Sequence, residues 1–109
     1  LLRLPQATIG VNHIGASVIY IDSFGNAVLN VNTELFESAR KNRNFILTYP
    51  KAEIEIKKIC VNYDFAEVGE SLALFNQEGN LEIAINRDSA SQLLGIKVND
   101  QIRIEFINP

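Results

Sequence analysis

Short runs with the side-chain period of a strand recur along the chain. In residues 18–31, VIYIDSFGNAVLNV, Val18, Tyr20 and Asp22 alternate with Ile19 and Ile21, as in a strand with both faces largely covered, and a mirrored run at 27–31 follows Ser23-Phe24-Gly25-Asn26. Successive side chains of a strand point to opposite faces, so this spacing predicts a β-hairpin. Glycine adopts a positive φ at little steric cost, and we expect Gly25 to do so in the turn.

The same alternation predicts further strands at residues 45–49, 52–57, 72–75, 81–85 and 101–107. A helix at 33–40, with Thr33 as its N-cap, is predicted before the first of these strands. A shorter helix at 89–94, with Asp88 as N-cap and Gly95 as C-cap, is predicted before the last. The predicted fold is therefore all-β: a small Greek-key barrel of about seven strands with one or two short helices, an arrangement that leaves no open sheet edges.

Composition and charge exclude several classes of function. The chain has 109 residues, enough for one domain, with 21% charged residues and a net charge of −3. Its basic residues are scattered, so we expect no nucleic-acid partner. No apolar run approaches the roughly 18 residues of a membrane span, so we expect no membrane partner. The single cysteine, Cys60, cannot form an internal disulfide, which suits a reducing compartment, and we expect a cytoplasmic protein.

The chain offers little for metal binding or nucleophilic catalysis. His13 is its only histidine, so we expect no metal site and no Ser–His pair built within it, and no catalytic residue. The chain also lacks methionine. We therefore expect it to be the C-terminal part of a longer protein, with residues 1–16 as a linker or edge segment and residues 17–109 as the barrel domain.

The predicted hairpin turn carries more chemistry than a turn requires. Asp22, Phe24 and Asn26 place a carboxylate, an aromatic ring and a carboxamide within five residues. One interpretation is local, because Asp at the first position and Gly at the fourth are typical of a type I turn. The other is a binding site, and the hairpin alone does not decide between them.

Two segments together resemble one protein family. Residues 20–26, YIDSFGN, followed by Asn30-Val31, resemble the signature Ile-Asp-x-Phe-Gly-Asn…Thr-Asn-Ile. Residues 74–86, LFNQEGNLEIAIN, are similar to a partner signature, Asn-Ser-x-Gly-Tyr-Leu-Glu-Ile-Ala. Both belong to the C-terminal domain of the S-adenosylmethionine (SAM) hydroxide adenosyltransferases, or SAM hydrolases, and of the related fluorinases and chlorinases. The resemblance covers residues 16–107.

The resemblance implies an enzyme whose substrate is SAM and which needs no cofactor. An N-terminal α/β domain, outside this chain, would orient the attacking water or halide. The C-terminal barrel of a neighbouring subunit in a homotrimer would close the pocket over the ligand. The implied reaction is an in-line displacement at the ribose C5′, which in the hydrolases yields adenosine and methionine. Because it joins an anion to a sulfonium, a site that excludes water favours the transition state.

The resemblance also implies roles for individual residues. Asp22 resembles the aspartate that receives the methionine ammonium in a charge-assisted hydrogen bond. Phe24 resembles the ring that stacks on the adenine, and Asn26 the amide that matches the adenine edge, as carboxamides do for adenine generally. Tyr63 falls at a second aromatic position of the pocket.

A further four residues complete the predicted site. The backbone from Ile85 to Arg87 lies where main-chain groups meet the adenine. Gln77 replaces a serine that resembles a ligand of the methionine carboxylate, and Glu78 stands where fluorinase has an arginine. The acidic Glu78 favours a hydrolase over a fluorinase. The alternative function is a non-catalytic small β-barrel that serves as an interaction or oligomerisation module.

Overall fold

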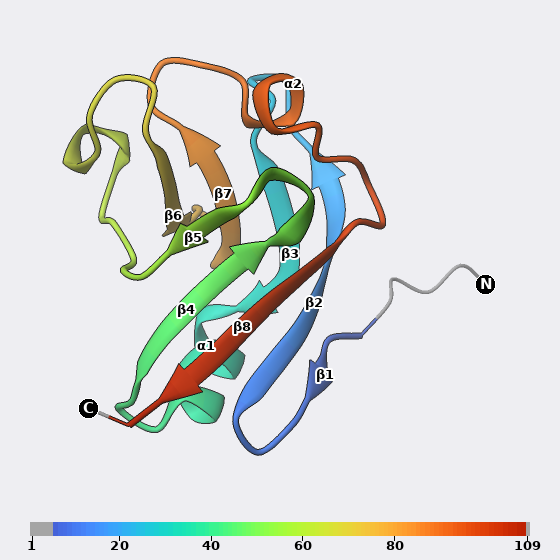
Figure 1. Cartoon of the computed structure of the whole chain (residues 1–109), viewed down its shortest axis with the longest axis vertical. Helices are drawn as coiled ribbons and strands as arrows, with labels where there is room; N and C mark the ends of the chain where they lie inside the picture. The colour runs from blue at the N-terminus through green and yellow to red at the C-terminus, as the bar shows by residue number, and fades with distance from the viewer. Residues whose placement is uncertain (1–5, 109) are drawn as a thin grey trace.

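The alternating segments form strands in the computed structural model, which describes residues 6–108 (Figure 1). The strands are β1 (Thr8–Ile9), β2 (His13–Ile21), β3 (Ala27–Asn32), β4 (Asn44–Tyr49), β5 (Ile54–Ile56), β6 (Ser71–Phe75), β7 (Asn80–Ile85) and β8 (Gln101–Ile107). The helices are α1 (Thr33–Arg40) and α2 (Ala90–Leu94), and short 3-10 turns occupy Pro50–Ala52 and Tyr63–Phe65. The predicted all-β barrel of about seven strands with two short helices is confirmed.

The strands pair antiparallel in the order β5-β4-β8-β2-β3-β7-β6, with β1 added to β2. Ile59 forms a bridge with Ala73 of β6, which brings the two ends of the sheet together and nearly closes the barrel. The connection from β5 to β6 joins the two ends of this order at the nearly closed seam, and the chain crosses between other non-adjacent strands from β3 to β4 and from β7 to β8. These crossovers contain α1 and α2, which lie at opposite ends of the barrel in Figure 1.

The alternation of β8 shows how the sequence pattern builds the core. Ile102, Ile104 and Phe106 are buried, whereas the residues between them are exposed. Phe36 of α1 closes the lower end of the barrel and packs edge-to-face on the rings of Phe45, Phe75 and Phe106 at 5.2–6.0 Å. Burial of these apolar side chains is the main source of stability.

Both predicted N-caps are wrong by one residue. The Leu35 backbone N–H donates to Asn32 Oδ1 at 2.7 Å, so Asn32 caps α1 in place of Thr33. Ser89 caps α2, because its hydroxyl accepts from the Gln92 N–H at 3.2 Å. In each case two adjacent residues have side chains that can cap a helix, and sequence spacing does not separate them. Gly95 is the C-cap of α2, as predicted, with φ of 70°.

Two segments differ in extent from the predicted elements. The strand predicted at 52–57 is shorter, since Pro50 starts a 3-10 turn and Glu53 has a φ of 54°, so pairing begins only at β5. β2 begins at His13, and its first residues pair with β8, while β1 forms a short outer strand beside it. Neither α1 nor α2 is long and apolar enough to cross a membrane, and they are the only helices of the described residues other than 3-10 turns.

Candidate ligand-binding site

The turn between β2 and β3 is held by the side chain of Asp22. Asp22 Oδ1 accepts the backbone N–H groups of Phe24 and Asn26, both at 2.9 Å. Gly25 has a φ of 83°, as predicted for this turn, and its carbonyl accepts the Ser91 N–H of α2 at 2.8 Å. The local interpretation of Asp22 as a turn residue is therefore correct as far as it goes.

Turn geometry does not explain Phe24. Its side chain lies at the hairpin tip, and 78% of the residue is exposed. No other described aromatic ring packs against it. Ligand pockets are lined largely by apolar and aromatic side chains, so a ring at this position can serve as a ligand contact.

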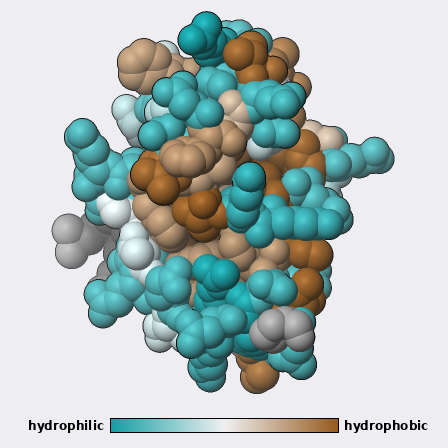
Figure 2. Space-filling model, turned by 90° about the vertical axis from the view of Figure 1, so that its left-hand side faces the viewer, coloured by the Kyte–Doolittle hydropathy of each residue, from teal (hydrophilic) through white to brown (hydrophobic). Residues whose placement is uncertain are grey.

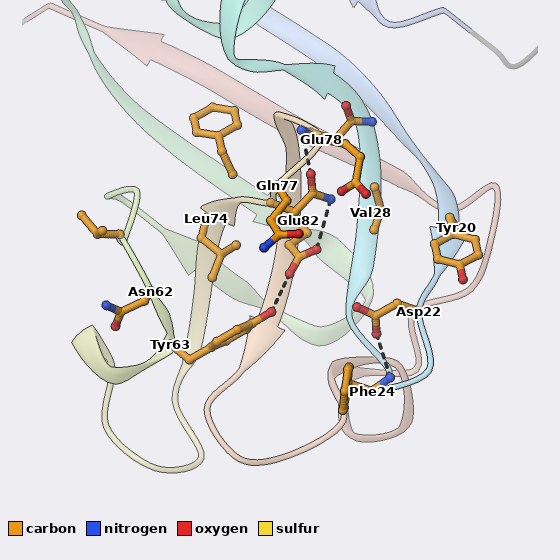
Figure 3. A pocket seen from close by; sticks show the side chains of 14 residues that line it. Tyr20, Asp22, Phe24, Val28, Asn62, Tyr63, Leu74, Gln77, Glu78 and Glu82 are labelled. Carbon is orange, nitrogen blue, oxygen red and sulfur yellow. Dashed lines mark hydrogen bonds between the residues drawn. The ribbon is translucent and has the colours of Figure 1, made fainter.

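Asn26 connects the turn to a second part of the chain. It is almost fully buried, and its amide nitrogen donates to Asp22 Oδ2 at 3.1 Å and to the Tyr63 hydroxyl at 3.2 Å. Tyr63 in turn donates to Glu82 Oε1 at 2.8 Å, a bond drawn in Figure 3. Four side chains from two hairpins and a loop thus form one hydrogen-bonded chain, which we call the Asp22–Glu82 network.

Burial raises the pKa of Tyr63 to about 12, and its hydrogen bond to Glu82 and the negative charges of Glu82 and Asp22 act in the same direction. The hydroxyl is therefore protonated at neutral pH and remains available to donate to Glu82.

The predicted site residues lie around two adjoining pockets. The larger, a cleft of about 900 Å³, is lined by Asp22, Gln77 and Glu78. The smaller, of about 410 Å³, is lined by Asn26, Ile85 and Arg87. Phe24 and Tyr63 line both. The structure therefore brings all eight predicted residues together around the hairpin tip and the adjacent face of β7.

Figure 3 shows how the cleft runs across this face. It extends from Phe24 at the hairpin tip, past Tyr63 and Glu82, to Gln77 and Glu78 in the turn between β6 and β7. Val28 and Leu74 form part of its apolar floor.

Sequence reasoning missed Glu82 as a member of the site. Glu82 is only 3% exposed, lies in the cleft, and accepts from both Tyr63 and Asn76 Nδ2, the latter at 3.4 Å. A signal for it was present, because an acidic residue interrupts the apolar run LEIAI at residues 81–85. A carboxylate within a buried strand requires hydrogen-bond donors, which marks it as part of a polar network.

Hydrophobic side chains gather on the side of the molecule that carries β6 and the segment before it (Figure 2). Val61, Phe65 and Val68 of that segment are 61–81% exposed, and Val61 also lines the cleft. The cleft is thus open to solvent and bordered by apolar surface. Among the described residues, no three His, Cys, Asp or Glu side chains are grouped so as to hold a metal ion.

The fold and these pockets define a small antiparallel barrel domain with two adjoining pockets on one face. The sequence model of the SAM hydroxide adenosyltransferase C-terminal domain matches residues 16–103, and the chain belongs to this family. It is 35% identical over 93 residues to the (R)-S-adenosyl-L-methionine hydrolase of Methanocaldococcus jannaschii. That match covers 82% of this chain and 35% of the length of the hydrolase.

Two solved structures share the fold. A crystal structure of an uncharacterised conserved protein from Thermotoga maritima superposes with a TM-score of 0.80 at 25% identity, over 95% of this chain and 40% of that one. A conserved hypothetical protein from Thermus thermophilus has a TM-score of 0.66 at 25% identity, over 98% of this chain and 40% of that one. In each case the chain matches less than half of the longer relative.

Proposed function

We propose that this chain is the substrate-closing C-terminal domain of a cytoplasmic SAM hydrolase, which converts SAM and water to adenosine and L-methionine. The observation that carries the proposal is the division of the predicted residues between two adjoining pockets. Residues with implied adenine contacts line the smaller pocket, residues with implied methionine contacts line the cleft, and the two aromatic residues lie between them. This is the arrangement that an elongated ligand with two different ends requires.

The smaller pocket suits the adenine end of SAM. Phe24 offers an exposed ring on which a purine can stack. Asn26 offers a carboxamide, and the backbone at Ile85 and Arg87 offers main-chain groups beside it. Arg87 has a positive φ of 63°, which turns the chain sharply at the end of β7 and sets the shape of this rim.

The cleft suits the methionine end. Asp22 already accepts three hydrogen bonds, but a carboxylate has about four acceptor positions, so one is left for an ammonium group. The Gln77 amide is exposed at the far end of the cleft, where it can donate to a carboxylate. Glu78 beside it is acidic and disfavours a second anion there, so further carboxylate contacts would come from outside this chain.

In the proposed reaction the oxygen of water attacks C5′, the C5′–S bond breaks, methionine leaves as a neutral thioether, and one water proton is released. The groups that orient the water would belong to an N-terminal α/β domain, so this chain supplies binding contacts only and needs no cofactor. Its open cleft and apolar border support closure by another subunit of a homotrimer, which would exclude water from the reacting atoms. We propose no nucleic-acid or membrane partner.

A second candidate function is a non-catalytic barrel that mediates protein contacts. Two observations favour it: Asp22 serves the turn, and Val61, Phe65 and Val68 present apolar surface that another protein could cover. This candidate predicts no affinity for SAM, adenosine or methionine.

The test is product analysis with the intact protein that carries this domain. SAM supplied in ¹⁸O-labelled water should yield methionine and adenosine labelled at the 5′ oxygen, and added fluoride or chloride should give no 5′-halogenated nucleoside. The isolated 109-residue chain should give no turnover. A halide-dependent product would contradict the hydrolase, and absence of both turnover and ligand binding would favour the non-catalytic module.

A further inference from the structure

The amide oxygen of Asn26 is a hydrogen-bond acceptor that the fold leaves unused. Asn26 is only 4% exposed, and its nitrogen is committed to Asp22 Oδ2 and the Tyr63 hydroxyl. No described residue donates to its Oδ1. Every fully buried side-chain nitrogen or oxygen of the described residues has a partner, so this oxygen is reached by solvent. The pocket that Asn26 lines with Ile85 and Arg87 is where a ligand can meet it.

The partners of Asn26 determine which way round its amide lies. A carboxylate oxygen accepts only, so the Asn26 atom 3.1 Å from Asp22 Oδ2 is the nitrogen. Tyr63 has one hydroxyl proton, which it donates to Glu82 Oε1 at 2.8 Å. The Tyr63 oxygen is therefore left as an acceptor for the same Asn26 nitrogen. The orientation follows from the chemistry of the neighbours and does not depend on distinguishing O from N.

Glu82 fixes the direction of this chain of hydrogen bonds. It lies in the middle of β7 at 3% exposure, where a carboxylate must be paired. It accepts from Tyr63, and without that acceptor the Tyr63 proton could turn toward Asn26 and favour the opposite amide orientation. The effect of Glu82 on the pocket is thus transmitted through Tyr63.

We infer that Tyr63 and Glu82 are positioning residues, which hold the Asn26 amide oxygen toward the pocket and so select purine nucleosides with a hydrogen-bond donor at position 6. A 6-amino group donates to this oxygen, a purine without a 6-substituent leaves it unpaired, and a 6-oxo group presents a second acceptor. The inference rests on the proposed function, and specifies how the same site chooses its base.

The first test compares adenosine with purine riboside, which differ only in the 6-amino group, by calorimetric titration of the intact protein. The wild-type protein should bind adenosine roughly tenfold more tightly, the ratio expected when a largely buried acceptor loses its donor. In Tyr63→Phe one of the two hydrogen bonds that hold the amide is lost, and the ratio should fall severalfold. Tyr20→Phe is the matched control. The Tyr20 hydroxyl has no partner among the described residues, and its side chain lines the cleft but not the smaller pocket, so the adenosine-to-purine-riboside ratio should stay at the wild-type value.

The second test reverses the orientation of the Asn26 amide with a double variant that carries both Asp22→Asn and Tyr63→Phe. The introduced carboxamide must keep its oxygen toward the backbone N–H groups of Phe24 and Asn26, so its nitrogen replaces Asp22 Oδ2. The Asn26 oxygen should then turn toward that nitrogen and present its own NH₂ group to the pocket. Relative to the wild-type protein, the preference should shift toward inosine over adenosine by roughly tenfold.

The outcomes separate the inference from the function on which it rests. Equal weakening of adenosine and purine riboside in Tyr63→Phe would show a merely structural role and overturn the inference. An unchanged adenosine-to-inosine ratio in the paired variant would do the same. If the wild-type protein binds adenosine and purine riboside equally, the inference is wrong and the proposed function stands. If the wild-type protein binds no nucleoside at all, the proposed function fails and the inference with it.

Discussion

Two tyrosine–carboxylate pairs among the described residues use the same chemistry in different surroundings. Tyr49 donates to Asp100 Oδ2 at 2.6 Å, and Tyr63 donates to Glu82 Oε1 at 2.8 Å. In each pair burial is the main cause that raises the pKa of the tyrosine to about 12, and the carboxylate adds to it. Tyr49 is 1% exposed, however, whereas Tyr63 is 39% exposed and lines both pockets.

The two pairs differ in where their hydrogen bonds end. Asp100 also accepts from the Lys97 N–H and from Lys51 Nζ, and the Tyr49 hydroxyl lies 3.3 Å from the Gly95 carbonyl. These bonds hold the segment after α2 against the end of β4. The Asp22–Glu82 network instead ends at the free oxygen of Asn26. A polar network with all its partners inside the fold stabilises the barrel, and one with an unused acceptor beside a pocket is suited to bind a ligand.

We expect the largest effect on the free energy of unfolding from Gly25→Ala, which disturbs the hairpin turn that holds the Asp22–Glu82 network. A Cβ at Gly25 would overlap the Ser89 hydroxyl, and the φ of 83° is unfavourable for alanine. We expect a loss of about 2–4 kcal/mol in the free energy of unfolding, together with weaker adenosine binding. Gly79→Ala is the control: its φ is 85°, but the nearest atom to its Cβ is 3.9 Å away. It should cost about 1–2 kcal/mol. If urea unfolding shows equal losses of stability in Gly25→Ala and Gly79→Ala, the close contact of Gly25 with Ser89, the N-cap of α2, is contradicted.

Tyr49→Phe tests the other pair, Tyr49 and Asp100. It removes the hydrogen bond from the buried Tyr49 hydroxyl to the Asp100 carboxylate, whose side chain is 12% exposed, and should cost about 1.5–3 kcal/mol of the free energy of unfolding. Because this network does not reach the pockets of the hairpin tip, adenosine affinity should be unchanged at temperatures where the variant is folded. A substantial loss of adenosine affinity would show that the two networks are coupled.

A smaller effect on the free energy of unfolding is expected at alkaline pH. Both tyrosines have a folded-state pKa of about 12 against 10.0 in the unfolded chain. The folded protein therefore keeps protons that the unfolded chain releases, so the stabilisation is complete below pH 10 and is lost as the pH rises toward 12. Unfolding measured across this range should show a shallower decline in Tyr49→Phe and in Tyr63→Phe than in the wild-type protein. An unchanged slope in both variants would contradict the assigned environments.

The sequence predicted most of the barrel because its strands follow from local alternation, as at residues 101–107. The prediction failed where local signals compete. Asn32 and Thr33 are adjacent and both can cap a helix, so the N-cap was misplaced by one residue. The strand predicted at 52–57 is shortened by the 3-10 turn that begins at Pro50. The site residues were predicted from resemblance, and their arrangement was not. Asn26 and Tyr63 are 37 positions apart, and no local pattern reports that contact or shows that Glu82 faces the cleft.

We propose that the Asp22–Glu82 network at the hairpin tip binds the adenine end of SAM. The most direct measurement is kcat/KM for SAM hydrolysis by the intact protein, compared between Asn26→Ala and the wild-type protein, with adenosine and methionine affinities measured in parallel. We predict that kcat/KM and adenosine affinity each fall roughly tenfold or more, while methionine affinity, which Asn26 affects only through its hydrogen bond to Asp22, changes much less. Unchanged kcat/KM and adenosine affinity in a folded Asn26→Ala protein would contradict the account.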